Sequence, residues 1–492
     1  MIKPGKRPHL HSVRFRNFKA FRDSGEINLR PITLIVGKNS AGKSSIIKGI
    51  AAAAQTVKER GLPDSNFRLI GDNVNLGTFY DTIYNNDIGE NFSIDFKLAQ
   101  PISGWKKSSD RWNFSFSYQR NEDNPLAAVI SGVEVEYQKS INDKYSIVRS
   151  GGLYKNRRSE SSPRGMKMQL SRVKSTNLTD NDILPTMEDK EKQIPHLKEL
   201  YDVIKKLNQE KGEPDYIDKW KLFIRDFALE ADNDFYDANF EKTEAAPLRR
   251  TRSQIAGWSR NLNRMLADSS YLGPIRLEPA REARLSQGSN QRIGPKGENL
   301  EKILHYRYTR DEKFRQNLDS HLKNLGIADS IKTSPSFTKV DGKEQDTGYI
   351  KILLKKSGNY RSMLDLGFGT SQVLPVVLEI TSREDTLILL EQPELHLHPA
   401  AQSAMGSVLK SSIEQGNQLI VETHSANLIE RLRRLIRENQ LNKNDVNIIY
   451  VGSNDNNETF CQSIGFDENG KFTEEWPEDT FFGEREKEYL GW

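Results

Sequence analysis

The stretch that most constrains this chain is Gly37-Lys38-Asn39-Ser40-Ala41-Gly42-Lys43-Ser44, which fits the pattern G-x-x-x-x-G-K-[ST]. The apolar, β-branched run from 31 to 36 precedes it and predicts a buried strand. The run from 45 to 54, which ends in alanines, follows it and predicts a helix. A glycine loop between a strand and a helix is the context in which this pattern binds phosphate. We therefore expect an α/β unit to form around the loop.

The residue types in the loop predict how it would hold a phosphate. Glycine at both ends lets backbone N–H groups wrap around an anion without Cβ clashes, and the helix that follows contributes the positive end of its dipole. Lys43 would reach the β- and γ-phosphates of ATP, and the Ser44 hydroxyl would hold Mg²⁺. The predicted nucleotide-binding residues here are Gly37, Lys38, Asn39, Ser40, Ala41, Gly42, Lys43, Ser44 and Ser45.

Length and composition limit the number of domains and the classes of partner that the chain can have. The chain has 492 residues, enough for two to four domains of roughly 100–200 residues each. Its net charge of +4 is nearly balanced, so charge alone favours neither nucleic acid nor a membrane as partner. Cys461 is the only cysteine, which excludes an intramolecular disulfide. No apolar run approaches the roughly 18–20 residues that span a bilayer, and residues 1–8 lack an apolar signal core. We expect a cytoplasmic protein without a membrane partner.

Alternation of apolar and polar residues predicts strands in the N-terminal part. Residues 9–29 predict a hairpin beside the strand that precedes the glycine loop. In that position Arg16 or Lys19 would either contact the base or ribose of a nucleotide or be an ordinary solvated side chain. Further alternation between 92 and 148 predicts an antiparallel sheet. Residues from about 196 to 266 have a helical pattern without a sustained heptad register, so a long coiled coil is not expected.

The C-terminal third returns to alternating strands and helices. A Gly-rich turn at 366–372 precedes an apolar helix, for which Ser371 is a candidate N-cap. The runs 386–390 and 418–421 are apolar throughout, as buried parallel strands should be. Ligands bind at the carboxyl ends of such strands. The residues found there are Glu391-Gln392-Pro393-Glu394 after the first strand and Glu422-Thr423-His424-Ser425 after the second.

Arginines cluster between 249 and 292. The cluster lacks an interleaved aromatic array, and its members would either form a nucleic-acid face or build salt bridges and phosphate contacts. Within it, the run 271–276 predicts a strand that ends in a Gly-Pro turn, which can aim a side chain at a site. The arginines are Arg249, Arg250, Arg252, Arg260, Arg264, Arg276, Arg281, Arg284 and Arg292.

Taken in order, these motifs resemble the ATP-binding-cassette heads of the SMC-like and OLD-like ATPases. The loop at 37–44 resembles their Walker A motif, 366–372 their signature motif, 387–394 their Walker B motif and 423–425 their switch histidine. The resemblance is strong at both ends of the chain and weak between about 100 and 270. It implies an α/β fold, a P-loop NTPase head of the ABC type with a mixed or parallel core sheet, an antiparallel β subdomain and a mostly helical insertion.

The same resemblance implies a division into four segments. Residues 1–100 and 346–492 would form the two parts of the head, 101–270 a β-rich and then helical arm, and 271–345 a connection back to the head. In OLD-like and Gabija ATPases a Toprim nuclease domain follows the switch histidine. The stretch from 425 to 492 is too short for that domain, so we expect any effector to be a separate polypeptide.

The resemblance assigns catalytic roles to Lys43, Glu391, Gln392, Glu394 and His424. Glu391 and Ser44 would hold Mg²⁺, and His424 would contact the γ-phosphate. Cassette ATPases usually have a water-polarising glutamate where this chain has Gln392. Three interpretations follow: Glu394 assists hydrolysis, hydrolysis is weak or absent, or Gln392 is an engineered residue that traps ATP. We favour the first interpretation, with slow turnover.

The resemblance also implies partners. Gly369 and Ser371 would contact the γ-phosphate bound to a second subunit, so that ATP joins two heads in a homodimer or a higher homo-oligomer. Similar stand-alone bacterial ATPases occur in anti-phage defence systems such as PARIS, Septu, Gabija and retron modules, where they work with a nuclease or toxin. We expect an ATP-driven switch of this kind. The alternatives are a DNA-binding repair or maintenance ATPase that uses the region Arg249–Arg292, and a scaffold that binds ATP without hydrolysing it.

Overall fold

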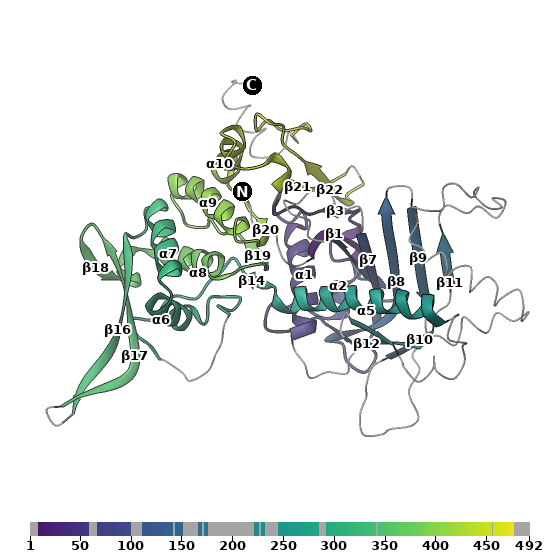
Figure 1. Cartoon of the computed structure of the whole chain (residues 1–492), viewed down its shortest axis with the longest axis horizontal. Coiled ribbons are helices and arrows are strands. Elements are labelled where there is room, and N and C mark those ends of the chain that lie inside the picture. Colours follow the sequence, from purple (N-terminus) through teal and green to yellow (C-terminus); the bar gives the residue numbers. More distant parts are fainter. Residues whose placement is uncertain are drawn as a thin grey trace, which may run out of the picture.

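The structure is a computed structural model of the whole chain (Figure 1). It describes residues 8–58, 66–99, 111–140, 143–150, 166–169, 172–175, 221–225, 228–231, 245–284, 292–340, 343–454 and 456–476. Side chains are described for fewer residues, since those between 136 and 256 are outside this set. The statements below concern the described residues.

A six-stranded core sheet organises the head. Its order is β14 (Ser270–Leu272), β19 (Leu387–Glu391), β20 (Gln418–Glu422), β4 (Ile32–Gly37), β21 (Val446–Ser453) and β22 (Thr459–Ile464). The first five strands are parallel, and β22 is antiparallel to β21. Each apolar run that predicts a buried strand in the sequence is therefore a strand of this sheet, next to or near β4.

The two faces of the core sheet pack into two different cores. On β4, Ile35 faces the core that contains α1 (Lys43–Lys58) and the antiparallel sheet, whereas Leu34 and Val36 face the core that contains α6 to α10. The period of two along a strand produces this division. Residues on both faces are apolar because both faces are covered, as expected for parallel strands.

Five helices cover the second face of the core sheet (Figure 1). Their buried residues all belong to one apolar cluster with that face, which fixes the helices relative to the strand ends. The helices are α6 (Leu300–Arg310), α7 (Glu312–Asn324), α8 (Phe368–Ser382), α9 (Pro399–Ile413) and α10 (Ala426–Arg437). No helix in the described part of the chain is long and apolar enough to cross a membrane.

A second, antiparallel sheet covers α1 from the other side (Figure 1). Its longer strands confirm the sheet predicted between 92 and 148. The strands are β1 (His9–Phe18), β2 (Phe21–Asp23), β3 (Ile27–Asn28), β5 (Asn66–Arg68), β6 (Phe92–Ala99), β7 (Arg111–Arg120), β8 (Ala127–Ser140), β9 (Asp143–Ser150) and β11 (Arg172–Ser175), and a short helix, α2 (Phe79–Thr82), precedes β6.

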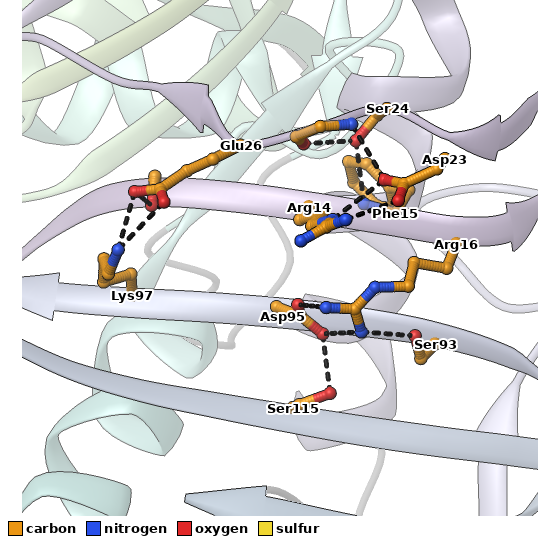
Figure 2. A network of polar contacts seen from close by, with 12 residues as sticks. Arg14, Phe15, Arg16, Asp23, Ser24, Glu26, Ser93, Asp95, Lys97 and Ser115 are labelled. Atoms are coloured by element: carbon orange, nitrogen blue, oxygen red, sulfur yellow. Dashed lines mark hydrogen bonds and ion pairs between the residues drawn. The ribbon is translucent and has the colours of Figure 1, made fainter. Parts of the chain in front are cut away.

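The predicted N-terminal hairpin is correct, but its predicted neighbour is wrong. Strand β1 pairs with β6 of the antiparallel sheet, and β4 pairs with β20 and β21. Arg16 accordingly points along the antiparallel sheet, where its guanidinium lies 2.8 Å from the Asp95 carboxylate (Figure 2). The Lys19 ammonium donates to the carbonyl oxygens of Leu76 and Asp81. Both side chains therefore have partners inside the protein.

The region with the helical sequence pattern is only partly helical. Helix α5 (Ala245–Asp268) confirms the pattern at its C-terminal end and runs across the antiparallel sheet (Figure 1). There Trp258 stacks on Trp112 of β7. However, β12 (Lys221–Arg225) and β13 (Ala228–Ala231) are strands, which form a small sheet with β10 (Met166–Gln169). The rest of the predicted helical stretch lies outside the described residues.

A long hairpin extends from the helical side of the head (Figure 1). It consists of β16 (Ser330–Val340) and β17 (Lys343–Lys356), flanked by β15 (Ala283–Arg284) and β18 (Asn359–Ser362). With the core sheet, the antiparallel sheet and the covering helices, it completes a mixed α/β architecture, and the predicted fold class is confirmed.

Two mid-helix glycines provide a test of how tightly α1 is packed. A Cβ on Gly49 would lie 2.4 Å from a ring carbon of Phe15, whereas a Cβ on Gly257 of α5 would meet nothing within 4 Å. Gly257→Ala should therefore stabilise the protein by up to about 1 kcal/mol through helix propensity. Gly49→Ala should destabilise it by about 1–3 kcal/mol, because the fully buried Phe15 cannot move away. Thermal and urea unfolding measure both, and equal stability of the two variants would refute the tight packing.

Candidate functional site

The glycine loop joins β4 to α1 in the way that its pattern predicts. Gly37 and Gly42 have φ values of 146° and 98°, which side chains rarely adopt. A Cβ on Gly37 would lie 2.1 Å from the carbonyl oxygen of Val451 on the neighbouring strand β21. Only glycine fits at that position, because the obstacle is backbone. The tips of Lys38, Asn39 and Ser40 are exposed around the turn.

Lys43 begins α1 and folds its side chain back over the loop. Its ammonium donates to the carbonyl oxygens of Gly37, at 3.0 Å, and of Lys38. The residue is only 4 % exposed, and this burial lowers the pKa of Lys43 while the Glu422 carboxylate raises it. The Lys43 ammonium therefore lies at the opening of the glycine loop, beside the N-terminus of α1.

Ser44 contacts an acidic residue that the sequence analysis left without a role. Its hydroxyl donates to a carboxylate oxygen of Glu422, at 2.8 Å, at the end of β20. Glu391 ends the neighbouring strand β19 and is directly opposite Glu422 in the parallel register. The Tyr271 hydroxyl of β14 donates to Glu391 at 2.9 Å. The ends of β14, β19 and β20 thus carry a phenol and two carboxylates, of which Glu422 contacts Ser44.

Burial beside a second carboxylate places Glu391 under electrostatic strain. Glu391 and Glu422 are 3 % and 5 % exposed. Burial raises the pKa of Glu391 to about 7; the Lys48 ammonium opposes this shift, and the nearby Glu422 carboxylate adds to it. A divalent cation would relieve this strain. Carboxylate and hydroxyl oxygens are ligands of the kind that Mg²⁺ takes, with waters and phosphate oxygens completing its octahedron, so Ser44, Glu391 and Glu422 fit a magnesium ion bound with a nucleotide.

The turn after β19 holds the remaining acidic candidate. Gln392 has a positive φ of 45°, and its backbone N–H donates to the Glu422 carbonyl oxygen at 2.8 Å. Two residues later, Glu394 accepts through Oε1 from the Thr423 hydroxyl, at 2.7 Å, and from the His424 backbone N–H, at 2.9 Å. Its Oε2 is buried and has no hydrogen-bond partner within the described protein. Burial raises the pKa of Glu394.

His424 stands just past β20, beside Glu394 and near Lys43. Its side chain is exposed at this edge of the sheet, and partial burial together with the Lys43 ammonium lowers the pKa of the ring. The next residue, Ser425, caps α10, because its hydroxyl oxygen accepts from the Leu428 N–H at 3.1 Å. The cap fixes the backbone that carries His424.

The signature-like residues lie at the start of α8. The predicted N-cap is wrong: α8 begins at Phe368, Gly367 is the N-cap with a φ of 95°, and Ser371 lies inside the first turn, where its hydroxyl donates to the Phe368 carbonyl oxygen. Gly369 packs against the loop after β19, because a Cβ there would lie 2.6 Å from the His396 carbonyl oxygen. Gly369 thus lies against the loop after β19, Ser371 is bonded within α8, and the described contacts do not join either residue to the loop at 37–44.

The structure therefore brings most predicted site residues to one edge of the core sheet. Lys43, Ser44, Glu391, Glu394 and His424 meet at the carboxyl ends of β4, β19 and β20. Sequence reasoning placed Glu422 at a strand end and Tyr271 in a strand but assigned neither of them a role. The signal for Glu422 was available, since it immediately follows an apolar strand, as Glu391 does.

The arginine cluster is not one basic surface. Arg276 is 3 % exposed and belongs to the core, and Arg292 donates to the Ala267 carbonyl oxygen. Arg281 pairs with Asp365 at 3.4 Å, and Arg260 is exposed. The side chains of Arg249, Arg250 and Arg252 lie outside the described residues. The burial of Arg276 removes that residue from any nucleic-acid face, and a face formed by the other arginines of the region stays a prediction.

Comparison with known proteins places this geometry in a family. Residues 9–429 match the family described as AAA ATPase domain. A local segment of 49 residues is 39% identical to Old nuclease of Escherichia phage P2, which covers 10% of this chain and 8% of that protein. The chain thus matches only a small part of the length of this curated relative.

Two solved structures have a similar course over most of the chain. One is an Smc head bound to the C-terminal winged-helix domain of ScpA, with a TM-score of 0.41, 11% identity and coverage of 94% of this chain and 98% of that one. The other is an Smc head with an extended coiled coil bound to the C-terminal domain of ScpA from Pyrococcus furiosus, with a TM-score of 0.36, 13% identity and coverage of 93% and 96%. Similarity at this level does not bear on what this chain does.

Substitution of Glu422 tests the proposed magnesium site. Glu422→Gln keeps the size of the side chain but removes the charge beside Ser44, so the Mg²⁺ concentration for half-maximal ATP turnover should rise by about tenfold or more. Glu414→Gln, on the far end of α9, is the matched control and should leave that concentration unchanged. A magnesium titration of steady-state turnover measures both variants. The cation site is misassigned if Glu422→Gln behaves like the control.

Proposed function

This chain belongs to the AAA ATPase domain family, and on that basis we propose that it is a slow ATPase that works as a nucleotide-dependent switch. ATP would close a dimer of two heads, and the closed dimer would hold or release a separate effector protein. The observation that carries the proposal is the convergence of Lys43, Ser44, Glu391, Glu394 and His424 at one edge of the core sheet. The effector class, a nuclease or toxin in anti-phage defence, rests on the family resemblance.

Each residue at this edge has a role in the proposal that follows from its position. The loop backbone at 37–44 and Lys43 hold the phosphates, and the Lys43 ammonium exchanges its carbonyl partners for phosphate oxygens. Ser44, Glu391 and Glu422 would hold a magnesium ion, and when bound the ion would supply positive charge beside the phosphates. His424 contacts the γ-phosphate. Tyr271 fixes the Glu391 carboxylate by donating to it.

Glu394 is the residue we propose as the base that polarises the attacking water. Its Oε1 is held by Thr423 and His424, so the carboxylate is rigid, while its buried Oε2 has no protein partner and remains able to accept a proton. Burial raises the pKa of Glu394 above the ordinary value of a glutamate, which makes this carboxylate a better proton acceptor. Gln392 carries a neutral amide that cannot accept a proton. This arrangement supports turnover that is slow but present.

ATP turnover and solution mass test the switch directly. The native chain should hydrolyse ATP and gain mass when ATP is added. Lys43→Ala should reduce turnover by at least about 100-fold, because it removes a cation that stabilises transferred charge, and it should abolish the gain in mass. Lys410→Ala, a surface substitution on α9, is the control and should change neither. An unchanged mass with intact turnover in the native chain would remove dimerisation from the proposal while leaving the ATPase.

A pair of substitutions distinguishes the two candidates for the water-polarising group. Glu394→Gln removes the carboxylate and should lower kcat by about 100-fold or more, with little change in ATP affinity. Gln392→Asn keeps an amide and a residue type that tolerates a positive φ, so its loss should be no more than about threefold. Single-turnover kinetics with pre-bound ATP separate chemistry from binding. The opposite order of the two losses would move the catalytic role to Gln392 and its neighbours.

A further inference from the structure

A cavity of about 250 Å³ lies beside the C-terminal half of α10, and the proposed chemistry does not use it. Helix α9, which packs beside α10 (Figure 1), and the turn at residues 469–470 supply the rest of its wall. Among the described residues that line it, the charged ones are Glu430, Arg431, Arg433, Arg434 and Arg437. Four positive charges against one negative charge make the cavity attractive to anions.

The arginines of α10 repel one another. Arg437 lies four residues after Arg433 and three after Arg434, and at both spacings side chains on a helix are neighbours. Like charges at these spacings destabilise a helix. Acidic residues offset the repulsion in part, because Glu430 pairs with Arg433 and Glu438 pairs with Arg434, both at 2.6 Å. Within the residues that the structure describes, the Arg437 side chain has no ion pair. An anion in the cavity would relieve the remaining repulsion.

Arg431 and Arg433 precede the last turn of α10, so the helix dipole does not account for them. Both are held in place through Nε. The Nε of Arg433 donates to the Gly470 carbonyl oxygen at 2.8 Å, and its guanidinium lies 4.5 Å from the centre of the Phe472 ring. The Nε of Arg431 donates to the Ser407 hydroxyl of α9 at 2.9 Å. Fixed guanidinium groups whose terminal nitrogens can still donate are well suited to bind an anion.

The turn that faces α10 is also fixed. Gly470 has a φ of 71°, and a Cβ there would lie 2.4 Å from the Arg433 carbonyl oxygen, so only glycine allows this close approach. The Asp467 carboxylate accepts from the backbone N–H groups of Asn469 and Lys471, both at 2.8 Å. The wall opposite the arginines therefore has a defined shape before any ligand arrives.

We propose that this cavity is a second anion site, which binds the phosphate or diphosphate group of a small molecule. The planar fork of arginine matches phosphate oxygens in pairs, and several forks in one cavity favour a compact group with more than one negative charge. The cavity is smaller than the roughly 300–1,000 Å³ of pockets that enclose drug-sized ligands, so the rest of a larger ligand would project into solvent.

The proposed anion site is separate from the glycine loop. Ser425 caps α10 next to His424, and Arg434 follows nine residues later. At about 1.5 Å per residue the two ends are roughly 13 Å apart along the helix axis. Occupancy of the cavity therefore does not depend on the phosphate loop, and the inference stands whether or not the chain dimerises.

Titration calorimetry with sodium diphosphate tests the site. The Lys43→Ala chain is the parent, because that substitution weakens the glycine loop as a competing site. Diphosphate should bind the parent, and the added pair Arg434→Met and Arg437→Met should raise Kd by about 100-fold, since each guanidinium contributes roughly tenfold. Arg315→Met, on the exposed side of α7, is the control and should leave Kd unchanged. Succinate should bind the parent at least about tenfold more weakly than diphosphate.

Glu430→Gln gives a test in the opposite direction. It removes the one negative charge of the lining, while the Gly470 carbonyl and the Phe472 ring still hold Arg433, so Kd for diphosphate should fall by about threefold or more. In the native background the arginine pair should keep its ATP turnover within about twofold, and thermal unfolding should show that it is folded.

Titration with ADP identifies the source of the anion. Equal affinity for ADP and diphosphate assigns the terminal group of a larger molecule, and binding of diphosphate alone assigns the free ion. The proposal is overturned if the arginine pair binds diphosphate as tightly as the parent, if succinate binds as well as diphosphate, or if Glu430→Gln leaves Kd unchanged or raises it.

Discussion

The parallel register of β4, β20 and β19 is the constraint on which the site depends. In that register Glu422 lies opposite both Ile35 and Glu391, so the phosphate loop and two carboxylates reach the same edge of the sheet. Two buried carboxylates in adjacent strands repel each other, and burial disfavours their ionised forms. The Ser44 hydroxyl and the Tyr271 hydroxyl offset this cost in part. The Lys43 ammonium near Glu422 and the Lys48 ammonium near Glu391 offset a further part, and a bound divalent cation would favour the ionised forms of both carboxylates.

Local patterns in the sequence were sufficient for the parallel strands of the core sheet, the glycine loop and the strand-end residues, because each depends on neighbours in the chain. The family resemblance that these motifs predicted is confirmed. Two of the errors concern long-range partners, and two are local, namely the N-cap of α8 and the strands β12 and β13 in the predicted helical stretch. The alternation of apolar and polar residues along β1 is compatible with pairing to either β4 or β6. In the structure β1 pairs with β6, and its apolar residues share a core with those of α1. Arg276 looks like its exposed neighbours in sequence, since its acceptors are backbone carbonyls roughly a hundred residues away. Ser371 is not the N-cap because α8 begins earlier, at Phe368. The N-cap is Gly367, whose φ of 95° is a conformation that glycine tolerates.

The structural role of Gln392 follows from its backbone and not from its side-chain amide. Its N–H donates to Glu422 on β20, its carbonyl accepts from Arg276, and its φ is positive. The position thus joins three elements irrespective of its side chain. A glutamate here would add another carboxylate close to Glu391 and Glu422, whose charges already oppose each other. Placing the base at Glu394 separates proton acceptance from this crowded pair, and Thr423 and the His424 backbone hold that carboxylate in place.

Rigidity on both sides of the site favours a switch over a motor. Gly369 lies against the His396 backbone, and Gln372 is bonded to Arg276, so the start of α8 and the turn after β19 are fixed to each other at two points. Packed elements of this kind change between discrete arrangements instead of deforming continuously. Nucleotide binding at one edge would then be transmitted as a rigid displacement of α8, and slow hydrolysis would set how long the displaced arrangement persists. In the proposed switch, the lifetime of the displaced arrangement would be the signal, and such a lifetime suits the control of a separate effector better than the generation of repeated strokes.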